Sequence, residues 1–286
     1  MKLGLVLEGG ANRGNFSVGA MDVLMEQEIW ADYVIGTSAG IANGVSYVSR
    51  QHGRGLKIAT DHMPTKQYSG LRHLLNPLNR SLYNLSYVFD GLPNKYLPFD
   101  YEAYAAFKGG VKAVTTNMRT GKAEYLECPR DDRECRYVMA SCAMPVLFPP
   151  VEINGEKYMD GGVSDPIPAQ HALDDGCDRI IVITTRERDY VKENEKAVDM
   201  VARLYKRRYP EFAEALRRRT ECYNESRAHL FELEKQGKAF LIEPVTTAGF
   251  ARTEKDLQKI YALYMHGREV AEARMAALKQ WIAAAE

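Results

Sequence analysis

The chain has 286 residues, of which 45% are hydrophobic and 27% are charged, and its 38 Lys and Arg residues balance 38 Asp and Glu residues. This composition is ordinary for a folded globular protein and argues against intrinsic disorder. A net charge of zero gives no reason to expect nucleic acid as a partner.

The five cysteines are odd in number and scattered, so we expect reduced thiols and not a disulfide framework. The sequence contains no CxxC motif and no His/Cys cluster, and we expect neither a metal nor a cofactor. The first apolar run ends at Glu8, too early for a secretory signal, and no stretch reaches the roughly 18 apolar residues of a membrane span. These features predict a cytoplasmic protein.

The first part of the chain alternates short apolar runs with helical periodicity. Residues 2–7 predict a buried strand, a glycine-rich turn follows at 8–14, and the apolar spacing predicts a helix over about 15–27. A second strand is expected at 33–35, and a second helix begins just after Ser38. This repeated order of strand, turn and helix is typical of a layered α/β fold.

The segment 59–107 is rich in Tyr, Leu, Asn and Pro and lacks regular periodicity, so we expect short helices and loops there. It is either a lid over the active site or a scaffold insertion without a gating role. The later strands are expected at 111–116, 123–127, 152–157, 179–184 and 240–242, the middle one as a hairpin. The later helices are expected at 136–142, 197–235 and 253–285.

Residues 36–40, with the sequence GTSAG, fit the pattern G-x-S-x-G. A strand before the motif and a helix after it are the context of a nucleophile elbow. Such a turn lifts the Ser38 hydroxyl above the sheet, beside a helix N-terminus that favours developing negative charge. Ser38 is therefore the candidate nucleophile, and the alternative is a structural serine that caps the helix.

The turn 9–14, with the sequence GGANRG, presents several backbone N–H groups at the start of a helix. One interpretation is an oxyanion hole formed by Gly9, Gly10 and Ala11. Another is a dinucleotide site, but Ala11 stands where the second glycine of G-x-G-x-x-G belongs, and Gly36 replaces the expected acid. The third is a plain helix start. We favour the oxyanion hole.

Asp160 ends an expected strand and is followed by two glycines. A serine hydroxyl needs a base that takes its proton, and a carboxylate held close to it in a partly desolvated site can do so. The pattern Asp-Gly-Gly by itself is more often a tight turn. His171, His229 and His266 follow Asp160 in the order that an α/β-hydrolase triad requires, so a triad stays open at this point.

These three motifs, in this order and with the apolar stretch 140–151, resemble the patatin-like phospholipase family, in its bacterial, cytoplasmic type. The resemblance covers roughly residues 2–185. It implies a three-layer α/β/α sandwich around a central, mostly parallel sheet. We expect a catalytic domain over 1–185, followed by a mainly helical extension over 186–286 that packs on the core.

The resemblance also implies a catalytic dyad of Ser38 and Asp160, without a third member and without a metal. Gly9, Gly10 and Ala11 would hold the oxyanion, although Ala11 stands where the family usually has a third glycine. The supporting residues implied by the motifs are Arg13, Gly14, Gly36, Gly40 and Gly161. The basic residue at position 13 would either brace the loop or contact a phosphate.

We therefore expect a lipid acyl hydrolase of the phospholipase A or esterase type, which forms a covalent acyl-enzyme. Its substrate would be a phospholipid or another acyl ester, with peripheral contact to a membrane as one way of reaching it. Two alternatives stay open, a lipid-binding module of the same fold without catalysis and, less favoured, a nucleotide-binding oxidoreductase.

Overall fold

The computed structural model describes residues 1–75, 81, 83–194, 197–251 and 253–284. Its centre is an eight-stranded sheet in the order β5-β6-β3-β2-β1-β7-β8, in which β4 pairs with β3 outside this path. The strands are β1 (Leu3–Leu7), β2 (Tyr33–Thr37), β3 (Gly110–Asn117), β4 (Ala123–Glu127), β5 (Val151–Ile153), β6 (Glu156–Asp160), β7 (Arg179–Ile183) and β8 (Ala239–Ile242).

Five of these strands are parallel, namely β3, β2, β1, β7 and β8. β4 and β6 run antiparallel to β3, and β5 runs antiparallel to β6. The central strands β1 and β2 are buried along their whole length. Their continuous apolar runs are typical of parallel strands that are covered on both faces.

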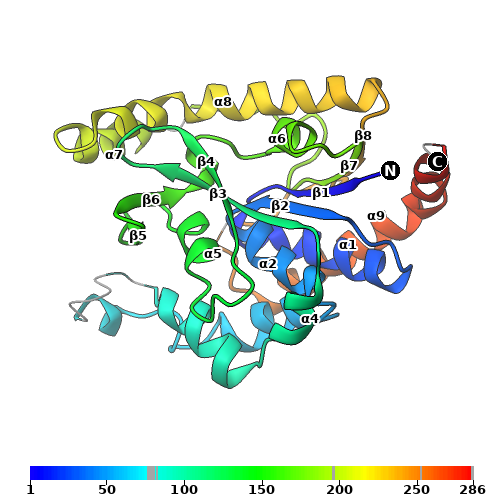
Figure 1. Cartoon of the computed structure of the whole chain (residues 1–286). Coiled ribbons are helices and arrows are strands. Elements are labelled where there is room, and N and C mark those ends of the chain that lie inside the picture. The colour runs from blue at the N-terminus through cyan, green and yellow to red at the C-terminus, as the bar shows by residue number, and fades with distance from the viewer. Residues whose placement is uncertain (76–80, 82, 195–196, 252, 285–286) are drawn as a thin grey trace.

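Helices lie on both faces of the sheet and give three layers (Figure 1). On one face lie α1, α2, α5 and α9, and on the other lie α6, α7 and α8. The α-helices are α1 (Gly14–Glu26), α2 (Ala39–Val48), α3 (Arg54–Lys57), α4 (Tyr101–Ala106), α5 (Arg136–Ser141), α6 (Ala169–Asp174), α7 (Ala197–Lys206), α8 (Pro210–Lys235) and α9 (Leu257–Ala283). The expected three-layer α/β/α sandwich with a mostly parallel sheet is confirmed.

The two long helices α1 and α9 pack with their backbones in close contact. A Cβ atom added at Gly19 would lie 2.0 Å from the carbonyl oxygen of Tyr264, and one added at Gly267 would lie 2.0 Å from that of Phe16. Only glycine permits this approach at either position. The pair of glycines thereby joins the last helix of the chain to the first.

The region 197–235, expected to be helical, contains two helices. α7 ends at Lys206 and α8 begins at Pro210, after Tyr209 in an extended conformation with φ −137°. A proline disfavours helical geometry for the residue before it, and this explains the break. Further along, β8 joins the sheet edge in parallel with β7. The boundary proposed at residue 185 stays a prediction.

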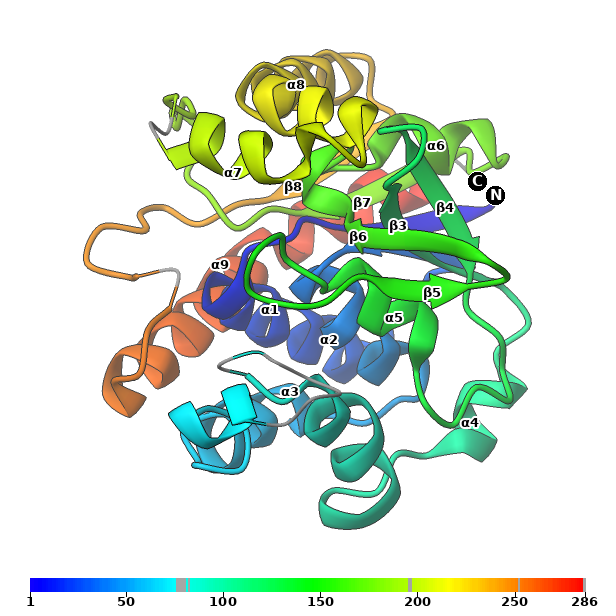
Figure 2. The same ribbon diagram turned by 90° about the vertical axis from the view of Figure 1, so that its left-hand side faces the viewer.

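The segment 59–107 contains short helical elements, as expected, and lies beyond α2 and α5 from the sheet (Figures 1 and 2). The elements in and next to this segment are the short helices η2 (Ile58–His62), η3 (Leu71–Leu75) and η4 (Tyr87–Tyr96), followed by α4. Residues 76–80 and 82 of the candidate lid lie outside the described residues.

A second group of short helices lies directly in the loops that follow strands. These are η1 (Ala11–Arg13) after β1 and η5 (Gly161–Val163) after β6. Because β1, β2 and β7 are parallel, their carboxyl ends meet at one edge of the sheet, on the left in Figure 1 and toward the viewer in Figure 2. Ligands of open α/β sheets bind at this edge.

Candidate active site

The turn between β2 and α2 is sharp and places Ser38 at its apex. Ser38 has φ 54° and ψ −125°, a backbone conformation that is strained for any residue except glycine. A Cβ atom at Gly36 would lie 2.7 Å from the backbone nitrogen of Ile41, and one at Gly40 would lie 2.4 Å from the carbonyl oxygen of Leu7. The two glycines of the motif therefore let the strand, the turn and the helix pack against one another.

Strand β3 brings Ser38 and Asp160 together. Thr37, at the end of β2, is opposite Val114 of β3, and Asp160, at the end of β6, is opposite the next residue, Thr115. β2 and β6 thus end at the same level on either side of β3. The Ser38 hydroxyl donates a hydrogen bond of 2.7 Å to Oδ2 of Asp160.

The side chain of Asp160 is buried. Its Oδ1 accepts a hydrogen bond of 2.8 Å from the backbone N–H of Gly162, and the backbone carbonyl oxygen of Asp160 accepts one of 2.9 Å from Thr116 Oγ1. A Cβ atom at Gly161 would lie 2.3 Å from the carbonyl oxygen of Val114. The glycine thus allows the turn after Asp160 to lie against β3, where the carboxylate faces the serine.

Ser141 is a member of this site that the sequence did not reveal. Its hydroxyl accepts a hydrogen bond of 2.8 Å from the backbone N–H of Ser38, and its side chain is completely buried. A polar residue inside the apolar stretch 140–151 was the available signal. Beside it, burial raises the pKa of the Cys142 thiol well above its ordinary value. Cys142 is therefore a neutral thiol, which is a poor nucleophile.

The glycine-rich turn after β1 lies next to Ser38. A Cβ atom at Gly9 would lie 3.1 Å from Cβ of Ser38, and one at Gly10 would lie 2.6 Å from Oγ1 of Thr185. Ala11 has φ 49° and lines a cavity together with Ser38. Within the described part of the chain, the N–H groups of Gly9 and Gly10 donate to no protein acceptor. The turn therefore offers donors close to the serine hydroxyl.

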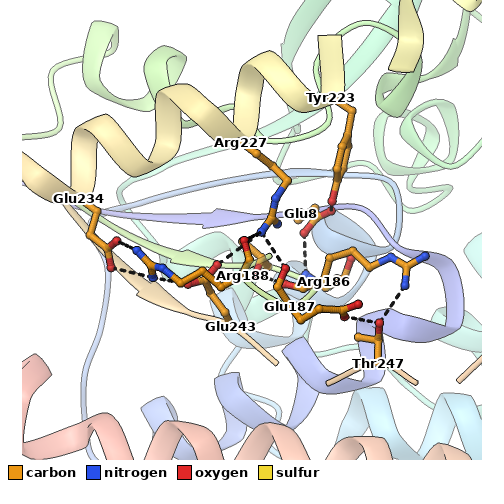
Figure 3. A network of polar contacts seen from close by, with 11 residues as sticks. Glu8, Arg186, Glu187, Arg188, Tyr223, Arg227, Glu234, Glu243 and Thr247 are labelled. Carbon is orange, nitrogen blue, oxygen red and sulfur yellow. Dashed lines mark hydrogen bonds and ion pairs between the residues drawn. The ribbon is translucent and has the colours of Figure 1, made fainter. Parts of the chain in front are cut away.

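Glu8 anchors this turn, and sequence reasoning missed this role. The Glu8 side chain is buried, and its oxygens accept hydrogen bonds of 2.6 Å from the backbone N–H of Thr185 and 2.7 Å from the hydroxyl of Tyr223 on α8 (Figure 3). Burial raises the pKa of the Glu8 carboxyl. A charged residue directly after an apolar strand was the signal in the sequence.

Arg13 and Gly14 lie at the end of the turn, where α1 begins. Arg13 lines a cavity that also contains Ser38 and Asp160. Gly14 begins α1, and a Cβ atom there would lie 3.2 Å from Cβ of Ala39 on α2. The small residue lets the first turns of the two helices approach each other.

The three histidines that could have completed a triad contact other groups. His171 stacks on Tyr125 with ring centroids 3.5 Å apart, His229 hydrogen-bonds Gln170, and His266 accepts a hydrogen bond from the N–H of Val245. None of these contacts, within the described residues, reaches Ser38 or Asp160. The serine hydroxyl donates instead to the Asp160 carboxylate, a group that can act as a base.

Two cavities of different character meet at Ser38. One, of about 190 Å³, is largely apolar and extends from Ser38 into the segment 59–107. Its lining side chains from that segment include Met63, Tyr68, Leu85, Phe89, Phe99 and Tyr104. The other, of about 300 Å³, is polar and is lined by Ser38, Asp160 and the turn at Gly9 and Gly10.

Among residues 1–75, 81, 83–194, 197–251 and 253–284, no group of three His, Cys, Asp or Glu side chains could hold a metal ion. The helices within these ranges include none that is long and apolar enough to cross a membrane.

The structure is an α/β fold in which a serine at a sharp strand-to-helix turn is hydrogen-bonded to a buried aspartate. The family model described as patatin-like phospholipase matches residues 5–173, and the chain belongs to this family. A second model, described as a domain of unknown function (DUF6363), matches residues 209–283.

Relatives are similar over part of their length. The chain is 27% identical over 202 residues to the "Uncharacterized protein YjjU" of Escherichia coli (strain K12), covering 64% of this chain and 52% of that protein. It is 30% identical over 203 residues to "Lysophospholipase NTE1" of Cryptococcus neoformans, covering 66% of this chain and 12% of that protein. The solved structure of VipD from Legionella pneumophila superposes with a TM-score of 0.48 and 14% identity, over 95% of this chain and 67% of that chain.

Proposed function

We propose that this protein hydrolyses carboxylic ester bonds of lipids through a dyad of Ser38 and Asp160. The observation that carries the proposal is the 2.7 Å hydrogen bond from the serine hydroxyl to Asp160 Oδ2, at a point where an apolar cavity ends. An apolar cavity with a reactive polar group at one end suits a substrate with an acyl chain and an ester.

In the proposed reaction, Ser38 Oγ attacks the ester carbonyl carbon while its proton passes to Asp160. The carbonyl oxygen becomes negative and accepts hydrogen bonds from the turn at Gly9, Gly10 and Ala11. Collapse of this intermediate expels the alcohol, which takes the proton from Asp160. Asp160 then removes a proton from a water whose oxygen attacks the acyl-serine, and it returns this proton to Ser38 Oγ as the acyl–oxygen bond breaks and the free acid leaves.

Several observations support this assignment of roles. The three histidines have other partners, and the Cys142 thiol is held neutral by burial. Membership in the patatin-like family favours an oxyanion hole over a dinucleotide site for the turn 9–14. The name lysophospholipase belongs to the relative NTE1, of which this chain covers 12%, and a lysophospholipid is among the substrates that we propose to test.

The segment 59–107 is part of the same proposal, as a lid that lines the acyl-chain cavity. Peripheral contact with a membrane and a cytoplasmic location also belong to it. Sedimentation with phospholipid vesicles tests the contact, and cell fractionation tests the location. Activity that is the same toward lipid monomers and toward vesicles would count against a lid that opens at a lipid surface.

The experiment is labelling with a fluorescent fluorophosphonate, which reacts with activated serines, followed by ester hydrolysis. Wild type should be labelled and active. Ser38→Ala should lose the label and several orders of magnitude in kcat. Asp160→Asn should be nearly as damaging, because its amide cannot take the proton. Ser49→Ala, which removes a serine hydroxyl at the other end of α2, is the matched control.

Labelling that persists in Ser38→Ala would exclude this serine as the nucleophile. A folded wild type that binds lipid but neither reacts with the probe nor turns over esters would be a binding module of the same fold. Nicotinamide cofactor binding without labelling would point instead to the oxidoreductase.

A further inference from the structure

The polar cavity beside Ser38 is strongly basic. Four positive side chains line it, those of Arg13, Arg186, Lys192 and Arg219. The acidic residues that line it in the described chain are two, Glu8 and Asp160. Both carboxylates are engaged, Glu8 by Thr185 and Tyr223 and Asp160 by Ser38 and Gly162. Four cations against two carboxylates give the lining of the cavity a net positive charge, which disfavours the binding of a cation.

Three of the four basic residues are held in place by the end of the sheet and by α8. Arg186 follows β7 and donates a hydrogen bond of 2.8 Å to Thr247 Oγ1 (Figure 3). Its guanidinium carbon lies 4.0 Å from the ring centroid of Tyr190. The Lys192 ammonium lies 5.1 Å from the ring centroid of Tyr223. Contacts with aromatic rings orient a cation and leave its charge in place.

Arg219 connects this cavity to the catalytic turn. It projects from α8, and its Nε donates a hydrogen bond of 3.2 Å to the carbonyl oxygen of Gly162, whose N–H in turn binds Asp160. Its guanidinium is thereby fixed beside the reacting groups. Planar guanidinium groups and ammonium groups are the side chains that proteins use to bind phosphate.

The basic residues also have a common origin in the sequence. Arg186, Lys192 and Arg219 all lie beyond residue 173, where the match to the patatin-like domain ends, and Arg219 lies within the DUF6363 match over 209–283. The C-terminal part of the chain thus contributes one wall of the cavity that contains Ser38.

We propose that this cavity binds the phosphate of a lipid headgroup, and that the C-terminal region makes the enzyme prefer anionic headgroups without an ammonium. The inference rests on the proposed function of Ser38. With the acyl chain in the apolar cavity and the ester at Ser38, the headgroup would lie among the four cations. A phosphomonoester would gain the most, while a choline would bring a cation into a basic site.

The test uses three substrates that share one acyl chain. Lysophosphatidate has a phosphomonoester, lysophosphatidylcholine adds a trimethylammonium, and monoacylglycerol has no phosphate. Wild type should give the highest kcat/KM with lysophosphatidate. In Lys192→Gln and in Arg186→Gln, the ratio of kcat/KM for lysophosphatidate to that for monoacylglycerol should fall roughly tenfold or more, as expected for a lost charged hydrogen bond.

Arg188→Gln is the matched control, because Arg188 lies in the same segment but pairs with Glu234 and Glu243 outside the cavity. It should keep the wild-type ratio. Lys192→Gln is the decisive variant, since Arg219 also positions the catalytic turn. The same ratio in wild type and Lys192→Gln, or a wild-type preference for the choline lipid, would overturn the proposal.

Two further experiments distinguish a lipid headgroup from free phosphate, and the phosphate site from the proposed hydrolase activity. Inorganic phosphate should compete with lysophosphatidate, and this competition should weaken in Lys192→Gln. If wild type shows no headgroup preference but inorganic phosphate alters its hydrolysis of monoacylglycerol, the cavity binds free phosphate. That result would overturn the proposal that it binds a lipid headgroup.

Binding of lysophosphatidate to Ser38→Ala, measured by calorimetry, needs no turnover. If wild type hydrolyses no ester but this binding occurs and is lost in Ser38→Ala/Lys192→Gln, the proposed hydrolase fails and the phosphate site stands. If esters are hydrolysed but this binding does not depend on Lys192, the phosphate site fails and the hydrolase stands.

Discussion

Replacing Ser141 with alanine tests how the backbone of Ser38, the proposed nucleophile, is held in place. The Ser141 hydroxyl accepts the hydrogen bond from the backbone N–H of Ser38 at 2.8 Å and is completely buried. Ser141→Ala removes the acceptor and leaves this N–H without it. Nothing else in the dyad changes, so the variant isolates the support of the turn from its chemistry.

The expected effect of Ser141→Ala follows from two free energies, the cost of an unpaired N–H and the backbone strain at Ser38. A buried N–H left unpaired costs about 1–3 kcal/mol of folding free energy. The strained backbone at Ser38, with φ 54°, itself costs on the order of 1–3 kcal/mol and persists only because its surroundings impose it. Because the two terms are similar in size, loss of the hydrogen bond should let the turn relax. We expect kcat to fall about tenfold, equivalent to about 1.4 kcal/mol, with little change in KM.

The assay combines urea unfolding with the kinetics of a nitrophenyl ester. The matched control is Ser49→Ala, because Ser49 is also buried and its hydroxyl donates to the Ser46 carbonyl and to Gln51, so its loss strands no backbone N–H. Ser141→Ala should be less stable than Ser49→Ala by about 1–3 kcal/mol. Equal stability and equal kcat in the two variants would refute the supporting role of Ser141.

Three further predictions concern the titration of Asp165, the packing at Gly40 and the effect of a chelator. Burial raises the pKa of Asp165 to about 6 from its ordinary 3.8. The protonated carboxyl therefore stabilises the fold fully below about pH 4, and the free energy of unfolding falls by up to about 3 kcal/mol as the pH rises through 6. Urea unfolding of Asp165→Asn should lack that decline; a parallel pH dependence in both proteins would contradict it. Gly40→Ala should destabilise by about 3 kcal/mol or more, since its Cβ would lie 2.4 Å from Leu7 O, whereas Gly70→Ala, which meets nothing within 4 Å, should be neutral in thermal unfolding. EDTA should leave ester hydrolysis intact because the proposed steps need only the dyad, and loss restored by calcium would contradict this.

Much of the fold was predictable because the signals are local. The apolar runs at β1, β2 and β7 and the helical spacing of α1 depend on neighbouring residues, and each predicted element is found within a few residues of its expected range. The break inside the helical region 197–235 has a local cause as well. The helix over 197–235 is broken before Pro210, as a proline requires of the residue that precedes it.

Contacts between distant residues were beyond the reach of such patterns. Glu8 and Tyr223 are 215 positions apart, and their hydrogen bond forms because α8 lies over the face of the sheet that contains β1 (Figure 1). Ser141 joined the site for a similar reason, since α5 lies beside the nucleophile turn. A buried polar group needs a partner, but a sequence pattern does not say which one.

The sequence by itself determined the layered α/β class, the family resemblance, and Ser38 and Asp160 as candidates, because turn chemistry and strand-end position are written in a few adjacent residues. Only the tertiary structure decided that these two side chains meet. They are 122 positions apart and lie 2.7 Å from each other because β2 and β6 pair with successive residues of β3. Strand order also placed Arg186, Lys192 and Arg219 around one cavity. The physical reason is that the hydrophobic effect is non-directional: it determines which faces of helices and strands are buried, but not which elements pack together. The pairing of strands determines which side chains become neighbours.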